Sequence, residues 1–145
     1  MLELVTRCYE QFRLITYRSM FRVLRERDSS LSAAEAFAVD VIYLLREPTI
    51  KQFADCLGIS QPNATYKVNH LIQKGYVEKL PSREDRREIH LRVTEKYMRY
   101  WQGGNDALQQ GLQQLESCFT PEEVDTFTRM IRALAETMPD RTANL

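Results

Sequence analysis

The sequence predicts a mainly α fold with a small β-hairpin wing, a winged helix-turn-helix combined with a helical dimerisation region. Three observations predict this class. Apolar residues recur three and four positions apart over most of the chain, the period of amphipathic helices. Two short helical segments are separated only by Gly58-Ile59-Ser60, as in a helix-turn-helix. Two strand-like stretches, 76–80 and 89–93, follow immediately and enclose a charged loop.

Length and composition fit one folded domain. The chain has 145 residues, 43% of them apolar, and only five glycines and five prolines, so it can bury a core and does not resemble a disordered protein. The net charge is zero, but it is segregated: residues 60–99 carry nine basic and five acidic side chains, and residues 100–145 carry three and seven. The basic part is therefore the candidate for contact with nucleic acid.

The start of the chain and its cysteines bear on location. Met1 is followed by Leu-Glu-Leu-Val, which lacks the basic-then-apolar pattern of a signal peptide. No uncharged run approaches the roughly 20 apolar residues of a membrane span. Cys8, Cys56 and Cys118 are far apart, without the spacing of metal ligands. We expect a cytoplasmic protein with free thiols, no metal and no cofactor.

The first segment, residues 1–30, is predicted to be an N-terminal dimerisation helix. Over Glu3 to Arg27 its apolar residues fall on more than one side. A helix of this kind needs partners beyond its own domain.

Residues 31–96 are predicted to form the DNA-binding lobe. Ser32-Ala-Ala-Glu35 and Thr49-Ile-Lys-Gln52 are capping boxes that start helices. Gly58 stands where a helix end needs a left-handed residue, and Ser60 is expected to cap the next helix, which ends at Gly75. The helix from Ser32 to about Arg46 is expected to bury the following side chains: Phe37, Val41, Leu44 and Leu45.

Residues 97–145 are predicted to be the C-terminal helices of the dimerisation region. A long helix runs from Thr94 to about Cys118, with a kink or a break expected at Gly103-Gly104. Thr120-Pro-Glu-Glu123 is a third capping box, and the helix that it starts ends near Pro139.

The second helix of the helix-turn-helix has an unusual outward side. If Ala64, Val68 and Leu71 face the core, the opposite side is poor in charge and rich in amides, hydroxyls and rings, whereas an ordinary solvated face more often carries Glu and Lys. Amides pair with adenine edges and hydroxyls with either base. The outward residues are Pro62, Asn63, Tyr66, Asn69, His70 and Gln73, flanked by Thr65 and Lys67.

In this order of elements the chain resembles the MarR family of bacterial transcription regulators. The resemblance rests on LSAAEAFAVDVIYLL, on IKQFADCLGISQPNATYKVNHLIQKGYVEKL and on DRREIHLRVTEK, and it covers nearly the whole chain. It implies a homodimer built from the first and last helices, with each recognition helix in a major groove. It also implies that Arg87 enters the minor groove and that Asp85 holds the loop by an ion pair.

The predicted partner is therefore double-stranded DNA with an inverted-repeat operator. Arginines at the loop tip can meet phosphates and a narrow minor groove. The sequence departs from the family at three positions. It has Tyr66 where the family often has arginine, Lys67 where it often has an aliphatic residue, and Tyr97 where it often has glycine. These departures bear on the DNA sequence that is preferred and on the angle between the DNA-binding lobe and the dimerisation helices. The predicted DNA-binding residues are Ser60, Gln61, Asn63, Thr65, Tyr66, Lys67, His70, Arg83, Asp85, Arg86 and Arg87.

Regulation is predicted less directly. The resemblance implies a repressor released by a small aromatic or anionic effector, and a cleft between lobe and helices would be lined by Phe12, Phe37, Tyr43 and Trp101. Aromatic residues at helical spacing are, however, more often part of a core. An alternative is a redox-sensing regulator that uses Cys8, although Cys8 also fits an apolar stripe.

Two other classes compete with a DNA-binding regulator. An enzyme is disfavoured because neither His70 nor His90 lies in a setting that suggests a metal or a nucleophile, and no glycine-rich phosphate loop is present. A winged helix used only for protein contacts is the second, and such domains usually lack an arginine-rich loop beside an amide-rich helix face.

Overall fold

The computed structural model describes residues 1–25, 31–81 and 89–138, with the backbone alone for residues 23 and 100–105. Its elements confirm the predicted fold class. They are α1 (Leu2–Arg25), α2 (Ala33–Leu44), α3 (Ile50–Leu57), α4 (Gln61–Gln73), β1 (Val77–Pro81), β2 (Ile89–Val93), α5 (Glu95–Cys118) and α6 (Pro121–Thr137).

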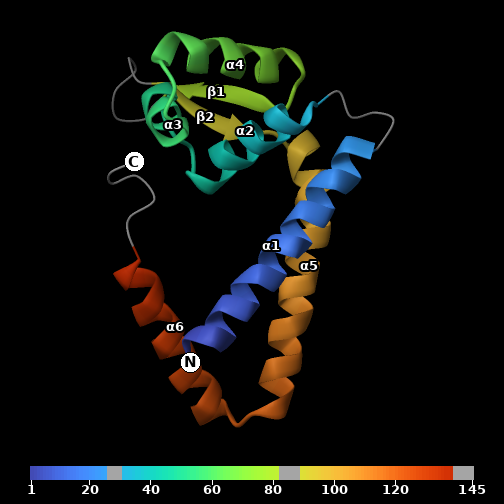
Figure 1. Cartoon of the computed structure of the whole chain (residues 1–145), viewed down its shortest axis with the longest axis vertical. Coiled ribbons are helices and arrows are strands. Elements are labelled where there is room, and N and C mark those ends of the chain that lie inside the picture. The colour runs from blue at the N-terminus through green and yellow to red at the C-terminus, as the bar shows by residue number, and fades with distance from the viewer. Residues whose placement is uncertain (26–30, 82–88, 139–145) are drawn as a thin grey trace.

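The elements divide into a lobe and a helical base. Figure 1 shows α2, α3, α4 and the hairpin gathered in the lobe, from which α1 and α5 extend side by side, while α6 turns back from the far end of α5. We call α1, α5 and α6 the helical base. No described helix is both long and apolar enough to cross a membrane.

The lobe is built around one apolar cluster. Its most deeply buried side chains come from α2, α3, α4 and the hairpin, so every element of the lobe contributes to one core. This arrangement fixes α4 through its inner side and leaves its outer side free of the core. The fully buried side chains include Val39, Ile42, Phe53, Val68, Leu71, Tyr76 and Leu91.

Local signals set the ends of the helices as predicted. In the three capping boxes the backbone N–H groups of Ser32, Thr49 and Thr120 donate to side-chain oxygens of Glu35, Gln52 and Glu123 over 2.7, 2.8 and 2.9 Å. Gly58 ends α3 in the left-handed region, with φ at 62°.

One capping prediction is wrong. Ser60 occupies the residue before α4, but its side chain makes no capping hydrogen bond. Ser60 is exposed and is therefore accessible to another partner.

The hairpin is joined to the turn between α2 and α3. In the antiparallel pair, Val77 lies opposite Val93 and Leu80 opposite His90. His90 also forms an isolated bridge with Thr49, and Leu91 N–H donates to the carbonyl oxygen of Pro48 over 2.8 Å. The base of the hairpin is therefore fixed to the helix-turn-helix.

The predicted buried side of α2 is partly wrong. Phe37 is 51% exposed and Leu44 46% exposed, whereas Val39 and Ile42 are buried. Apolar residues occur all around this helix, so the period does not select a side. The two alanines Ala36 and Ala38 face inward and allow close packing.

Of the kink or break expected in the long helix, the break does not occur. α5 is one continuous helix through Gly103-Gly104. A glycine costs about 1 kcal/mol in a helix interior relative to alanine, and packing of α1 along α5 can offset a cost of that size.

A buried polar contact joins lobe and base. The hydroxyl of Tyr97, near the start of α5, donates to Asp40 Oδ1 of α2 over 3.2 Å, and both residues are buried. The ring of Tyr97 also contacts that of Tyr43, with centroids 6.5 Å apart. Tyr97 therefore attaches α5 to α2.

Candidate nucleic-acid interface

The structure places α4 as a surface helix with a distinct outer side. Ala64, Val68 and Leu71 face the core, which leaves the first half of the helix exposed on the opposite side. Of the residues predicted there to contact DNA, Ser60, Gln61, Asn63, Tyr66 and His70 are exposed, and Thr65 and Lys67 are half-buried. α4 and the preceding Ser60 therefore carry seven of the predicted residues, five of them exposed and two half-buried.

Some polar side chains on α4 already form hydrogen bonds within the protein, and others do not. The hydroxyl of Thr65 donates to the carbonyl oxygen of Gln61 over 2.9 Å, so that hydroxyl keeps only acceptor capacity for a partner. Asn69 Oδ1 accepts from Lys79 Nζ over 3.1 Å. Tyr66 is 72% exposed and presents a ring and a hydroxyl outward.

Glu35 is a central residue that sequence reasoning missed, apart from its role in a capping box. Its Oε1 lies 2.7 Å from His70 Nδ1 and 2.8 Å from Lys74 Nζ, and its Oε2 lies 2.8 Å from the same Lys74 nitrogen. One carboxylate thus holds the start of α2 and the second half of α4. His70 and Lys74 lie 35 and 39 residues further along the chain, so no local period could reveal the contact.

The electrostatics of Glu35 follow from these partners. Partial burial by itself would raise the pKa of this carboxyl, but hydrogen bonds from Lys74, Ser32 and His70 outweigh it and lower the pKa to about 2. The carboxylate is therefore charged at neutral pH and accepts hydrogen bonds only.

A second contact links His70 to the outer surface. The rings of His70 and Tyr66, one helical turn apart, are nearly parallel, with an interplanar angle of 5° and centroids 6.4 Å apart. This separation is within the range of offset aromatic pairs. Tyr66 therefore has a neighbour that itself is held by Glu35.

The predicted loop residues Arg83, Asp85, Arg86 and Arg87 lie outside the described residues. The strands that flank the loop are described, and across them Arg92 Nη2 lies 2.8 Å from Glu78 Oε1. The hairpin lies beside α4 in the lobe (Figure 1).

The predicted ligand residues are not gathered in one cavity. Tyr43 lines a pocket of about 410 Å³ together with Arg46, Arg92 and Met98, among others. Phe12 and Phe37 are exposed and do not line this pocket. The side chain of Trp101 lies outside the described residues.

The cysteine and metal predictions can be placed only in part. Cys8 is exposed on α1 and has a free thiol. Within residues 1–25, 31–81 and 89–138, no group of three or more His, Cys, Asp or Glu is arranged to hold a metal ion.

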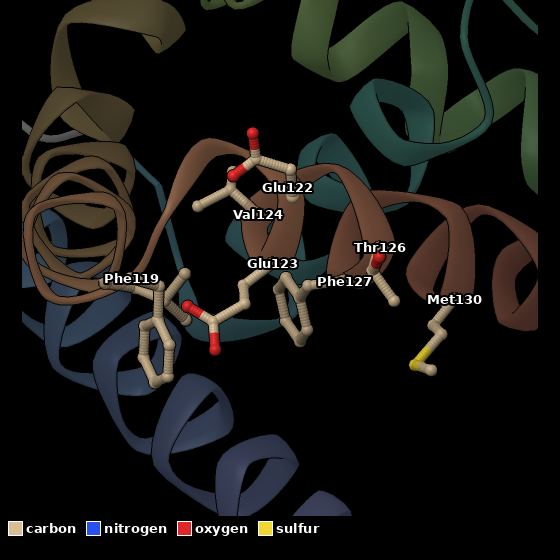
Figure 2. A pocket seen from close by; sticks show the side chains of 8 residues that line it. Phe119, Glu122, Glu123, Val124, Thr126, Phe127 and Met130 are labelled. Carbon is tan, nitrogen blue, oxygen red and sulfur yellow. The ribbon is translucent and has the colours of Figure 1, made fainter.

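The helical base carries a large apolar surface. α6 buries none of its residues. Beside it, at the corner between α5 and α6, a pocket of about 560 Å³ is lined by Phe119, Phe127 and Met130, among others. Figure 2 shows these three side chains projecting to the same side of the corner.

Comparisons with known proteins agree with this geometry. Residues 29–88, most of the lobe, match the family model described as MarR family. An uncharacterised HTH-type transcriptional regulator of Bacillus subtilis, YpoP, is 24% identical over 122 residues, which cover 81% of this chain and 86% of YpoP.

Solved structures show the same fold. RV1404 of Mycobacterium tuberculosis superposes with a TM-score of 0.57 at 14% identity, covering 96% of this chain and 92% of that one. FabT of Streptococcus pneumoniae, solved in complex with DNA, gives 0.53 at 22% identity and covers 92% of each chain. Together with the winged helix-turn-helix described above, these comparisons show that the lobe is similar to the MarR family model and that the chain shares the fold of the two solved structures.

Proposed function

We propose that this chain is a dimeric, sequence-specific DNA-binding regulator that inserts α4 into the major groove. The observation that carries the proposal is the outer side of α4, where Asn63, Tyr66 and their neighbours are exposed on a helix fixed from behind by a buried face. A protruding helix with amides and hydroxyls suits the major groove, where base edges present a distinct pattern of donors and acceptors.

The reading helix is tested by selecting bound sites from a random DNA library. Asn63→Ala and Tyr66→Ala should relax the selected sequence more than they weaken binding to unrelated DNA, since base contacts specify and phosphate contacts position. Gln113→Ala, a change of an exposed polar side chain on α5 in the helical base, is the control. If Asn63→Ala and Tyr66→Ala both select the wild-type site, α4 is not the reader.

The loop between the strands supplies the second contact of the proposal. Arg87→Ala should weaken binding to the preferred site by about 1–3 kcal/mol and reduce the dependence of affinity on salt, because one cation fewer meets the backbone. Affinity is measured by fluorescence anisotropy at several salt concentrations. An unchanged affinity and salt slope would remove Arg87 from the interface.

The dimer is proposed from the uncovered surface of the helical base. Leu4, Phe12 and Phe21 on α1, and Met130 and Ile131 on α6, are all at least 46% exposed. Apolar surface on this scale marks an association site. The charges also complement each other: α1 carries five arginines and two glutamates, or +3, and α6 carries four acidic and two basic residues, or −2.

A two-fold dimer would place two recognition helices about one DNA turn apart, so the operator should be an inverted repeat with half-sites roughly 10 bp apart or a multiple of that. Ile131→Asp should give a monomer of 17.0 kDa by light scattering and abolish tight DNA binding. Ala133→Asp, the same change of charge about 200° away around the helix, should leave the dimer intact. A wild-type monomer with full DNA affinity would overturn the dimer.

We further propose that the chain is a repressor released by a small aromatic or anionic effector. The support is the pocket of about 410 Å³ beside the lobe–base junction, where Arg46 lies over the ring of Tyr43, 5.3 Å from its centroid. Benzoate, a small aromatic anion, should lower DNA affinity, and Arg46→Gln should reduce that effect. Release by peroxide that is lost in Cys8→Ser would instead favour the redox alternative.

A further inference from the structure

Glu35, at the start of α2, contacts His70 of α4 and Lys74, the residue that follows α4. Its carboxylate completes the capping box of α2 through Oε2 and faces His70 Nδ1 through Oε1, at 2.7 Å in both cases. Oε2 therefore accepts from Ser32 and Oε1 faces His70, whereas Lys74 Nζ contacts both oxygens.

This geometry decides which nitrogen of His70 carries a proton. A carboxylate accepts hydrogen bonds and cannot donate them, so the Nδ1 atom facing it must be the protonated one. In the neutral ring Nε2 is then an acceptor. His70 is exposed on the side of α4 that is proposed to face DNA, where an acceptor suits the amino groups of adenine or cytosine.

Glu35 also restrains Tyr66 through the same histidine. The ring of Tyr66 is 72% exposed, and its nearly parallel neighbour is the ring of His70. A side chain held in place before binding loses less conformational entropy on binding. The contacts thus run from Glu35 to His70 and from His70 to Tyr66.

We propose that Glu35 is a positioning residue for sequence recognition, which fixes the tautomer of His70 and the orientation of Tyr66. The effect on sequence recognition rests on the proposed DNA-binding function, whereas the effect on the His70 tautomer rests only on the contacts of Glu35. We thereby assign to a capping residue of α2 a part in the specificity of α4.

Glu35→Gln separates this role from capping. In the box at Thr49, a glutamine already completes the same motif, with Thr49 N–H donating to Gln52 Oε1 over 2.8 Å. In Glu35→Gln the amide oxygen would take the place of Oε2, and the amide NH₂ would face His70. Since NH₂ donates, Nδ1 would become the acceptor and the proton would move to Nε2.

The first measurement is the ¹⁵N spectrum of the histidine rings in the full-length protein at about pH 8, where free histidine is neutral. The chain has only two histidines. His90 is an internal reference, because its Nδ1 lies 2.7 Å from the carbonyl oxygen of Glu47 and must also be protonated. We expect Glu35→Gln to exchange the tautomer of His70 and not that of His90. An unchanged His70 would overturn the inference.

The second measurement is the ratio of specific to unspecific DNA affinity. Glu35→Gln should lower this ratio about 3- to 10-fold, the scale of one or two hydrogen bonds, while unspecific affinity stays equal or rises because a negative charge is removed. Two variants serve as controls. Lys74→Met removes the ion pair between Lys74 and Glu35 and leaves the contact of Glu35 with His70. Glu123→Gln makes the same change of side chain in the capping box of α6, which is remote from α4. Both should keep the wild-type ratio.

The outcomes are distinguishable. An equal fall in the ratio for Lys74→Met would mean that Glu35 acts only by attaching α4, which overturns the positioning role. If the wild type prefers no sequence, the proposed function fails, and the tautomer measurement still decides whether Glu35 sets the state of His70.

Discussion

The lobe and the helical base use their apolar residues in opposite ways. Apart from Met20 and Tyr97, the buried apolar cluster lies entirely between Leu31 and Leu91, whereas α6 buries nothing and α1 exposes several aromatic rings. Both regions have amphipathic helices, so the period alone does not tell where an apolar stripe will be covered. The lobe completes its own core, and the base presents a surface that a second copy is proposed to complete.

The largest expected effect on stability comes from comparing an apolar residue buried within the lobe with one that is exposed on the helical base. Phe53 is fully buried in the lobe, and Met130 is 65% exposed on α6. Phe53→Ala should lower the free energy of unfolding by about 3–5 kcal/mol, independently of protein concentration. Met130→Ala should act only through association, so its effect should depend on concentration.

Urea unfolding at two protein concentrations makes this comparison. A Met130→Ala effect that is the same at both concentrations would contradict the contrast between the two regions.

The junction of the two regions should be intermediate. Tyr97→Phe removes the hydroxyl that donates to Asp40 Oδ1 and should cost about 1–3 kcal/mol, because a buried acceptor loses a partner. Thermal unfolding followed by circular dichroism gives the change in stability. A neutral result would show that this hydrogen bond does not contribute to joining α5 to the lobe.

Capping inside the lobe should have smaller effects. Thr49→Ala removes a side chain that accepts from Gln52 N–H over 3.2 Å and should destabilise the protein by about 1 kcal/mol. Ser60→Ala removes a side chain without a capping bond and should change stability by less than about 0.5 kcal/mol. Equal losses in urea unfolding would show that Ser60 does cap α4 in solution.

Acid should act on stability through Glu35. Its pKa falls from 4.5 in the unfolded chain to about 2 in the folded protein. The contribution to stability is therefore complete above about pH 4.5 and is lost as the pH falls towards 2. The stability difference between the wild type and Glu35→Gln should be constant from pH 6 to 8, and it should shrink at about pH 3 in urea titrations. A difference that grows on acidification would have the wrong sign.

Most of the fold could be predicted because its signals are local. The capping boxes at Ser32, Thr49 and Thr120 set three helix starts, and Gly58 set a helix end. The prediction was wrong where tertiary packing decides, as for Phe37 on α2, or for α5, which continues through two glycines.

The candidate interface was predictable to a smaller extent. The buried period of α4 correctly placed Asn63, Tyr66 and His70 on the outside. The contacts of Glu35 with His70 and Lys74 depend on the crossing of α2 and α4, and sequence spacing carries no information about such a crossing. That the exposed residues contact DNA stays a prediction.

The turn between α2 and α3 has a consequence for the order of folding. Arg46 and Glu47 both have positive φ, 58° and 62°, a backbone region that costs a residue other than glycine roughly 1–2 kcal/mol. Compensating hydrogen bonds come from β2, through His90 to Glu47 and Leu91 to Pro48. A turn between consecutive helices usually forms early, because its contacts are local. Here we expect the turn to reach its native conformation only after β2 has docked, so mutations in the turn should change the unfolding rate more than the folding rate.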